Sequence, residues 1–196
     1  MNPQILSQAR KLYELAQKAK LLTTESFSDV YPEAKLQEIL ARLDGDKAAF
    51  IENNQPLSNP EKIWDDGVEA RIKEDIAQTF MDFLQEHHQA FMVNWDQPVE
   101  DIVFNFQTVS SVPEITALGE KQVDGKWIQS MKIGDKIYDY QVSDEGFVPE
   151  VLYDINRSLF PLSKSIICAK VGDENQYLVI DLEFYPEFAD FGFATF

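Results

Sequence analysis

The sequence predicts an α+β fold, in which N-terminal helices pack on a C-terminal, mostly antiparallel sheet of about five to six strands. Apolar residues recur at helical spacing up to about residue 97, and alternate at strand spacing beyond it. Helices therefore precede strands instead of alternating with them, which favours α+β over α/β. A length of 196 residues with 44% apolar content suits one compact domain, or two small halves that share a core. We expect a single domain over residues 1–196, with a helical half at about 1–97 and a sheet half at about 98–196.

The first helices are marked by caps and breakers. Asn2 precedes Pro3, which is a typical helix start. A second helix is expected to begin at Pro32 and to end at the pair Asp44-Gly45, and "DKAAFIEN" is expected to add a short third helix. The apolar spacing that supports the first helix comes from Ile5, Ala9, Leu12, Ala16 and Ala19.

The strongest helical pattern follows the loop "NQPLSNP". One apolar stripe runs along it, while charged residues that include Glu69, Lys73 and Glu74 are expected to face away. The stripe consists of Val68, Ile72, Ile76, Phe80, Leu84 and Phe91.

Strand patterns dominate the second half. "DIVFNFQTV" alternates and predicts a strand. Asp124-Gly125 and Gly134-Asp135 each separate two strand-like runs, which predicts a three-strand meander over residues 115–142 with type I′ and type II′ turns. "VPEVLYDINRSLF" predicts a short helix, and "SIICAKV" is expected to pair with "YLVIDLEF" in a final hairpin.

Charge restricts the classes of partner. There are 34 Asp and Glu against 17 Lys and Arg, a formal net charge of −17. Nucleic acids and anionic membranes repel such a protein, so we expect neither as a partner, whereas a basic protein would be attracted. The plainer interpretation is that the acidity only maintains solubility. No signal peptide or membrane-length apolar run is visible, and we expect a cytoplasmic location.

The sequence contains no motif that names a chemistry. His87 and His88 are neighbours, without the His-x-x-x-His or Glu-x-x-His spacing of a helical metal site. No phosphate-binding glycine loop and no G-x-S-x-G nucleophile motif occurs. We therefore expect no catalytic, cofactor-binding or metal-binding residues and no enzymatic activity. The single cysteine, Cys168, lies in an apolar run and is expected to be a buried, inert thiol.

The last residues combine aromatic rings with carboxylates. No lysine or arginine follows Lys170, and five phenylalanines fall within the last fourteen residues. One interpretation places Phe188, Phe191 and Phe193 in the core; the other makes the segment an exposed interface for a basic partner. Asp181 and Glu183 are expected to share one face of a strand. The predicted partner-binding residues are Asp173, Glu174, Asp181, Glu183, Glu187, Asp190 and Phe191.

The ending resembles bacterial immunity proteins. The short helix "VPEVLYDINRSLF", followed by the aromatic-rich hairpin "SKSIICAKVGDENQYLVIDLEF", is similar in organisation to the immunity proteins of bacterial toxin systems. The resemblance covers roughly the last fifty residues and implies an antitoxin that binds and occludes a cognate, basic toxin. Two alternatives remain open, an acidic secretion or assembly chaperone and an enzyme with an unknown substrate. The sequence leaves the oligomeric state open.

Overall fold

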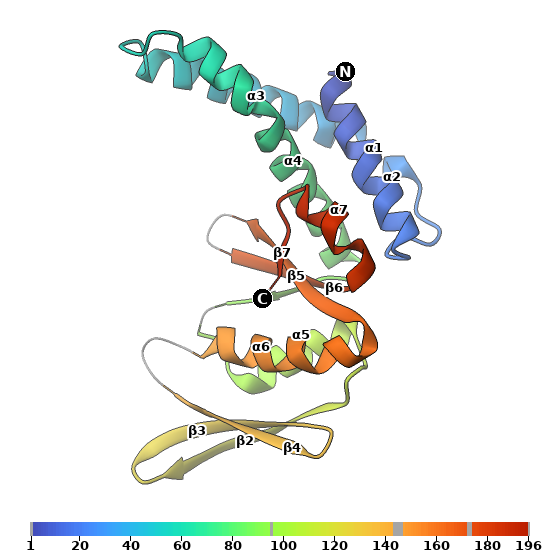
Figure 1. Cartoon of the computed structure of the whole chain (residues 1–196), viewed down its shortest axis with the longest axis vertical. Helices are drawn as coiled ribbons and strands as arrows, with labels where there is room; N and C mark the ends of the chain where they lie inside the picture. The colour runs from blue at the N-terminus through green and yellow to red at the C-terminus, as the bar shows by residue number, and fades with distance from the viewer. Residues whose placement is uncertain (1, 95, 143–146, 172–173, 196) are drawn as a thin grey trace. The chain divides into compact units, whose positions relative to one another are not determined.

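The computed structural model describes residues 2–94, 96–142, 147–171 and 174–195, and within them it confirms the α+β class (Figure 1). Seven α-helices and seven strands lie in this described part, and the strands form two antiparallel sheets of four and three strands. The chain divides into two compact units. Unit one comprises Met1–Phe83 with Pro186–Gly192, and unit two comprises Leu84–Tyr185 with Phe193–Phe196. That residues 1–196 form a single domain stays a prediction.

Unit one is helical. It contains α1 (Pro3–Lys18), α2 (Phe27–Val30), α3 (Glu33–Asn53), most of α4 (Pro60–Glu86) and most of α7 (Tyr185–Ala189). The predicted cap of α1 is confirmed, because Asn2 Oδ1 accepts a hydrogen bond from the Gln4 backbone N–H at 2.9 Å. The apolar spacing places Ile5, Ala9, Leu12 and Ala16 in the core.

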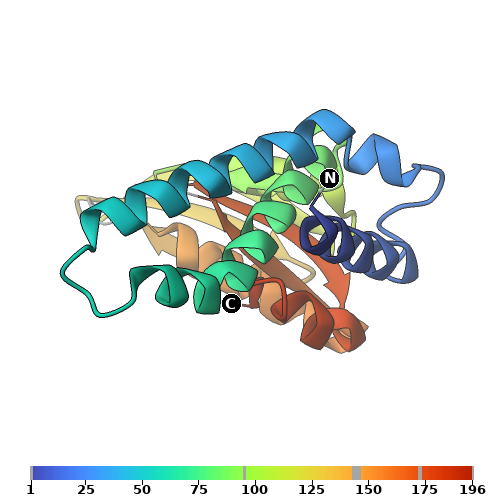
Figure 2. The same cartoon turned by 90° about the horizontal axis from the view of Figure 1, so that it is seen from above.

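The predicted break at Asp44-Gly45 is wrong, because α3 continues through both residues to Asn53 (Figure 2). Both residues are exposed, and a glycine inside a helix costs only about 1 kcal/mol. The following turns are held against α4. The Phe50 ring packs on the Trp64 ring, with centroids 5.6 Å apart, and Lys47 Nζ lies 2.8 Å from Asp65 Oδ1. These contacts offset the cost of the glycine.

The predicted stripe of α4 is confirmed except at its end. Ile72, Ile76 and Phe80 are fully buried. Phe91, however, lies in the short strand β1 (Phe91–Val93) and not in the helix. The helix ends at Glu86, and His88 follows with a φ of 57°, a left-handed conformation that a helix cannot continue through.

Unit two contains both sheets. Sheet A has the order β1-β6-β5-β7, with β5 (Lys164–Val171), β6 (Glu174–Asp181) and β7 (Ala194–Thr195). Sheet B has the order β2-β3-β4, with β2 (Ile115–Val123), β3 (Lys126–Ile133) and β4 (Lys136–Gln141). The predicted meander and final hairpin are thereby confirmed. Asp124 and Gly125 both have positive φ, 52° and 79°, as a type I′ turn requires.

The strand predicted from "DIVFNFQTV" is wrong, because these residues belong to helix α5 (Val99–Val109). The alternation of Ile102, Phe104 and Phe106 fitted a strand, but Phe104 is 67% exposed while its two partners are fully buried. Ile102, Val103 and Phe106 instead form one helical face. Glu100 and Asp101 occupy the first turn, where the helix dipole favours acids.

Helices α5 and α6 (Val148–Leu159) fill the core of unit two. The predicted helix α6 is confirmed. The short 3₁₀ turn η1 (Phe160–Leu162) follows α6 directly, and a second 3₁₀ turn, η2 (Leu182–Phe184), follows strand β6. The two α-helices lie between sheet A and sheet B (Figure 1). One buried apolar cluster joins residues from both sheets and both helices, including Ile102 from α5, Met131 from β3, Ile155 from α6 and Ile166 from β5.

Cys168 differs in part from its prediction. It lies in β5 and is partly rather than fully buried. Its burial nevertheless raises the pKa of the thiol above the ordinary value. The thiolate is therefore a minor species at neutral pH, and this supports the prediction that Cys168 is unreactive.

Candidate functional site

The predicted partner-binding residues divide between the two units. Asp173 lies outside the described residues, and Glu174 begins β6. In unit two, Asp181 ends β6 and Glu183 lies in η2. Unit one holds the remaining three residues, Glu187 in α7 and Asp190 and Phe191 just after it.

Asp181 and Glu183 do not form the predicted strand face. The strand ends at Asp181, and the 3₁₀ turn η2 gives Glu183 a different direction. Asp181 Oδ1 is also paired, at 2.7 Å, with Lys164 Nζ on the neighbouring strand β5. The charge of this carboxylate is thus balanced within unit two, which weakens it as a steering group.

Three aromatic rings of the ending are core residues. Phe188, Phe191 and Phe193 are 0%, 4% and 3% exposed, which confirms the core interpretation for these three. Phe191 therefore cannot be an exposed aromatic anchor as predicted. Asp190 and Glu187 remain exposed beside these buried rings.

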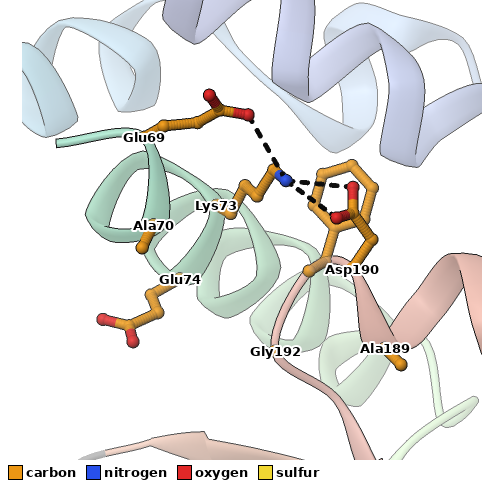
Figure 3. A pocket seen from close by; sticks show the side chains of 8 residues that line it. Glu69, Ala70, Lys73, Glu74, Ala189, Asp190 and Gly192 are labelled. Atoms are coloured by element: carbon orange, nitrogen blue, oxygen red, sulfur yellow. Dashed lines mark hydrogen bonds and ion pairs between the residues drawn. The ribbon is translucent and has the colours of Figure 1, made fainter. Parts of the chain in front are cut away.

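Asp190 and Phe191 line a cavity of about 380 Å³ within unit one (Figure 3). Helix α4 supplies one wall, and the turn after α7 supplies the other. The turn is closed by the Phe191 and Gly192 backbone N–H groups, which donate to carbonyls three residues earlier at 2.9 and 3.0 Å. Gly192 has a φ of +86°, which glycine adopts without strain. The lining residues are Glu69, Ala70, Lys73, Glu74, Ala189, Asp190, Phe191 and Gly192.

Lys73 connects the two walls. Its Nζ lies 3.0 Å from both Asp190 oxygens and 3.4 Å from Glu69 Oε1 (Figure 3). The Phe191 ring centroid is 6.0 Å from the same nitrogen. The hydrogen bond to Asp190 is the main reason that the pKa of Lys73 is raised, with Glu69 adding to it. Gln8 on α1 extends the network, donating from Nε2 to Glu69 Oε1 at 3.2 Å.

The cavity keeps an excess of negative charge. The lining contains three carboxylates, those of Glu69, Glu74 and Asp190, and one ammonium group, that of Lys73, so its formal charge is −2. The Glu74 carboxylate points away from Lys73 (Figure 3). Glu74 forms no ion pair with any residue in the described part of the chain. Such a lining attracts cations, while Ala70 and Ala189 provide apolar surface for the stem of a long basic side chain.

Sequence reasoning missed Lys73. The helical pattern placed it among solvent-facing charges, yet its side chain is only 16% exposed. Its partner Asp190 lies 117 residues away in the sequence. The i,i+4 spacing from Glu69 to Lys73 was a visible signal for one half of the network. No local pattern could have supplied the other half.

Comparison with protein-family models, with curated proteins and with solved structures gave no match. Within residues 2–94, 96–142, 147–171 and 174–195, no three metal-ligating side chains gather at one point. No helix in that part of the chain has the length and apolar character that crossing a membrane requires.

Proposed function

We propose that this chain is a cytoplasmic binding protein that neutralises a basic protein partner by occluding it, as the resemblance to immunity proteins implies. The observation that carries the proposal is the acidic cavity of unit one. It combines a formal charge of −2, small apolar walls and a Glu74 carboxylate that has no ion pair among the described residues, on a chain of net charge −17. This combination suits a lysine or arginine side chain from another protein.

Binding would proceed in two physical stages. Long-range attraction between the acidic chain and a basic surface raises the rate of encounter. A basic side chain then enters the cavity, where its charged end contacts the Glu74 carboxylate or the second oxygen of Glu69. The Asp190 and Glu69 side chains are 65% and 57% exposed, so they reach a partner without unfolding the turn. The bound chain would then cover the partner's active surface and block it sterically.

The proposal is tested with a partner captured from the native cell. Glu74→Lys is compared with Glu14→Lys, an exposed position on α1 that does not line the cavity. Both substitutions change the net charge equally. We expect Glu74→Lys to lower the association rate about tenfold more than Glu14→Lys, and to reduce the dependence of this rate on salt.

Two results would contradict the proposal. Equal association rates for the two folded variants would show that the cavity does not contact the partner. A partner that keeps its full activity when saturated with this chain would exclude neutralisation, even if binding occurs. Circular dichroism of each variant establishes that it is folded before binding is measured.

A further inference from the structure

The two outer strands of sheet B differ in how their open edges are built. Strand β2 has a register shift between Ala117 and Gly119, and Gly119 has a φ of +82°. Bulges of this kind protect a sheet edge against pairing with other chains. Strand β4 pairs with β3 without interruption, from Gln141 opposite Ile128 to Lys136 opposite Ile133. It contains neither proline nor glycine. Its edge is therefore open to another strand.

The hydrogen bonding shows which groups of β4 face outward. The Val142 N–H donates to the Trp127 carbonyl at 2.9 Å, on the side of β3. Antiparallel pairing alternates along a strand, so the even-numbered residues of β4 direct their backbone groups to β3. Ile137, Asp139 and Gln141 direct theirs to the open edge. No other strand in the described residues pairs with that edge.

The charge and polarity of sheet B set it apart from the rest of the chain. Residues 115–142 contain four lysines and four acids, so the whole net charge of −17 lies elsewhere. This segment is also rich in exposed apolar side chains. Ile137 on β4 is 57% exposed. The others in this segment are Leu118, Val123, Trp127 and Val142.

We propose that β4 pairs with β4 of a second copy of this chain, forming a continuous six-stranded antiparallel sheet. Two copies of net charge −17 repel each other, and the segment around β4, whose net charge is zero, is where they approach at the smallest cost. A basic partner is drawn to the acidic parts of the chain instead. The same edge is present on both copies, so a twofold axis pairs it with itself and closes the assembly at two chains.

The size of the contact predicts a weak dimer. The six residues of β4 extend over roughly 20 Å at about 3.3 Å per residue, so the backbone contact is short. Contacts of this size fall at the small end of protein interfaces, where affinities are micromolar or weaker. Added salt screens the repulsion between the copies and should strengthen the dimer. Salt should have the opposite effect on binding of a basic partner, so the two proposals can fail separately.

The test is sedimentation velocity over a concentration range reaching several hundred micromolar, at low and high salt. Ile137→Pro removes an outward N–H and leaves the pairing of β3 and β4 intact. Ile137→Lys introduces a charge at the same place, in case the proline variant does not fold. Val123→Lys is the matched control, since Val123 is an exposed apolar residue of β2 and the change in charge is identical.

We expect the wild-type chain and Val123→Lys to dimerise with dissociation constants within about twofold of each other. Both Ile137 variants should raise the constant by at least about tenfold. A wild-type chain that stays monomeric at the highest concentration and salt would overturn the proposal. Dimers that resist both Ile137 variants, or that Val123→Lys weakens equally, would also overturn it.

Discussion

The partly buried carboxylate of Asp75 shows what burying a charge costs this acidic chain. Asp75 on α4 is paired with Arg42 on α3, and the Asp75 side chain is 20% exposed while that of Arg42 is 52% exposed. The burial of Asp75 raises its pKa, and the hydrogen bond to Arg42 opposes this only in part. The ionised form of Asp75 is therefore less stable in the folded chain than in water. The ion pair aligns two helices, but it costs folding free energy at neutral pH.

The upward shift of the Asp75 pKa predicts how the stability of Asp75→Asn depends on pH. Because the folded pKa is above the unfolded value of 3.8, the folded state binds more protons in the window just above that value. The wild-type chain should lose stability as the pH rises through this window, and the variant should lose less. We expect Asp75→Asn to gain up to about 1 kcal/mol over the wild type between about pH 4 and pH 7.

Urea unfolding at both pH values measures this gain. Asp66→Asn is the control, because Asp66 is exposed on the same helix and the change in net charge is the same. If the control gains as much as Asp75→Asn, the effect belongs to net charge and not to the burial of Asp75.

Single residues were also where sequence reasoning was least informative. The apolar character of Phe188, Phe191 and Phe193 was visible, but exposure was not, because a ring at the chain end can either pack or protrude. Asp190 was identified as a charge near such rings. Its contact with Lys73 depends on folding across 117 residues, and no local spacing encodes that.

At the scale of elements, long patterns were decisive and short ones were ambiguous. The stripe of α4 extends over many turns and identifies a helix. The nine residues of "DIVFNFQTV" fit both periods, since apolar residues at 102, 104 and 106 alternate while 102, 103 and 106 form a helical face. For sheet B, the turn residues predicted the hairpins more firmly than the strand patterns did. Asp124-Gly125 permits the two positive φ angles that a type I′ turn needs.

The contact between helix α6 and strand β5 depends on one buried side-chain amide, that of Asn156. Asn156 is 1% exposed, and its Oδ1 accepts hydrogen bonds from the Ile166 N–H at 2.7 Å and the Ser165 hydroxyl at 3.1 Å. Strand β7 covers β5 only at Ile167 and Cys168. Asn156 thus satisfies a backbone donor that the edge of the sheet leaves without a strand partner.

Replacing the Asn156 side chain should weaken the contact between α6 and β5. Asn156→Ala leaves the Ile166 N–H buried without an acceptor, and we expect a loss of about 1–3 kcal/mol in the free energy of unfolding. Arg157→Ala, at the exposed neighbouring position, should change it by less than about 0.5 kcal/mol. Hydrogen exchange gives a local measurement, in which protection of the Ile166 amide should fall more than that of Leu178. Unchanged protection at Ile166 would contradict the assigned role of Asn156.

At the scale of the whole molecule, the order of helical and strand periods along the chain predicted the α+β class. Composition predicted the acidity, because net charge is a sum over many residues. It could not predict the division into units. The boundary at Phe83 falls inside the long helix α4, and the short segment Pro186–Gly192 belongs to the unit of the N-terminal helices. No change of composition marks either point, since the division reflects contacts between distant parts of the chain.

The excess of charge has a consequence for the stability of the isolated chain. With 34 acids and 17 bases, many carboxylates lack a basic neighbour, and their mutual repulsion favours expanded states. Mobile ions screen this repulsion, because the Debye length falls from about 30 Å at 0.01 M salt to about 3 Å at 1 M. Screening also weakens attractive ion pairs such as that between Lys164 and Asp181. Because acids outnumber bases two to one, the loss of repulsion between acids outweighs this effect. We therefore expect the thermal midpoint to rise with sodium chloride by several degrees, which corresponds to about 1 kcal/mol.

The measurement is a thermal unfolding series at low micromolar protein concentration, where self-association contributes little. Sodium sulfate at matched ionic strength separates the causes, because sulfate also stabilises proteins by exclusion from their surface. Screening predicts that chloride supplies most of the gain below about 0.2 M, where the Debye length changes most, and that sulfate adds a further rise above it. A midpoint that is flat or falling in chloride would mean that the attractive pairs, Lys73 with Asp190 among them, outweigh the repulsion of the remaining carboxylates. The excess charge would then carry no cost for a basic partner to relieve, and attraction alone would have to account for binding.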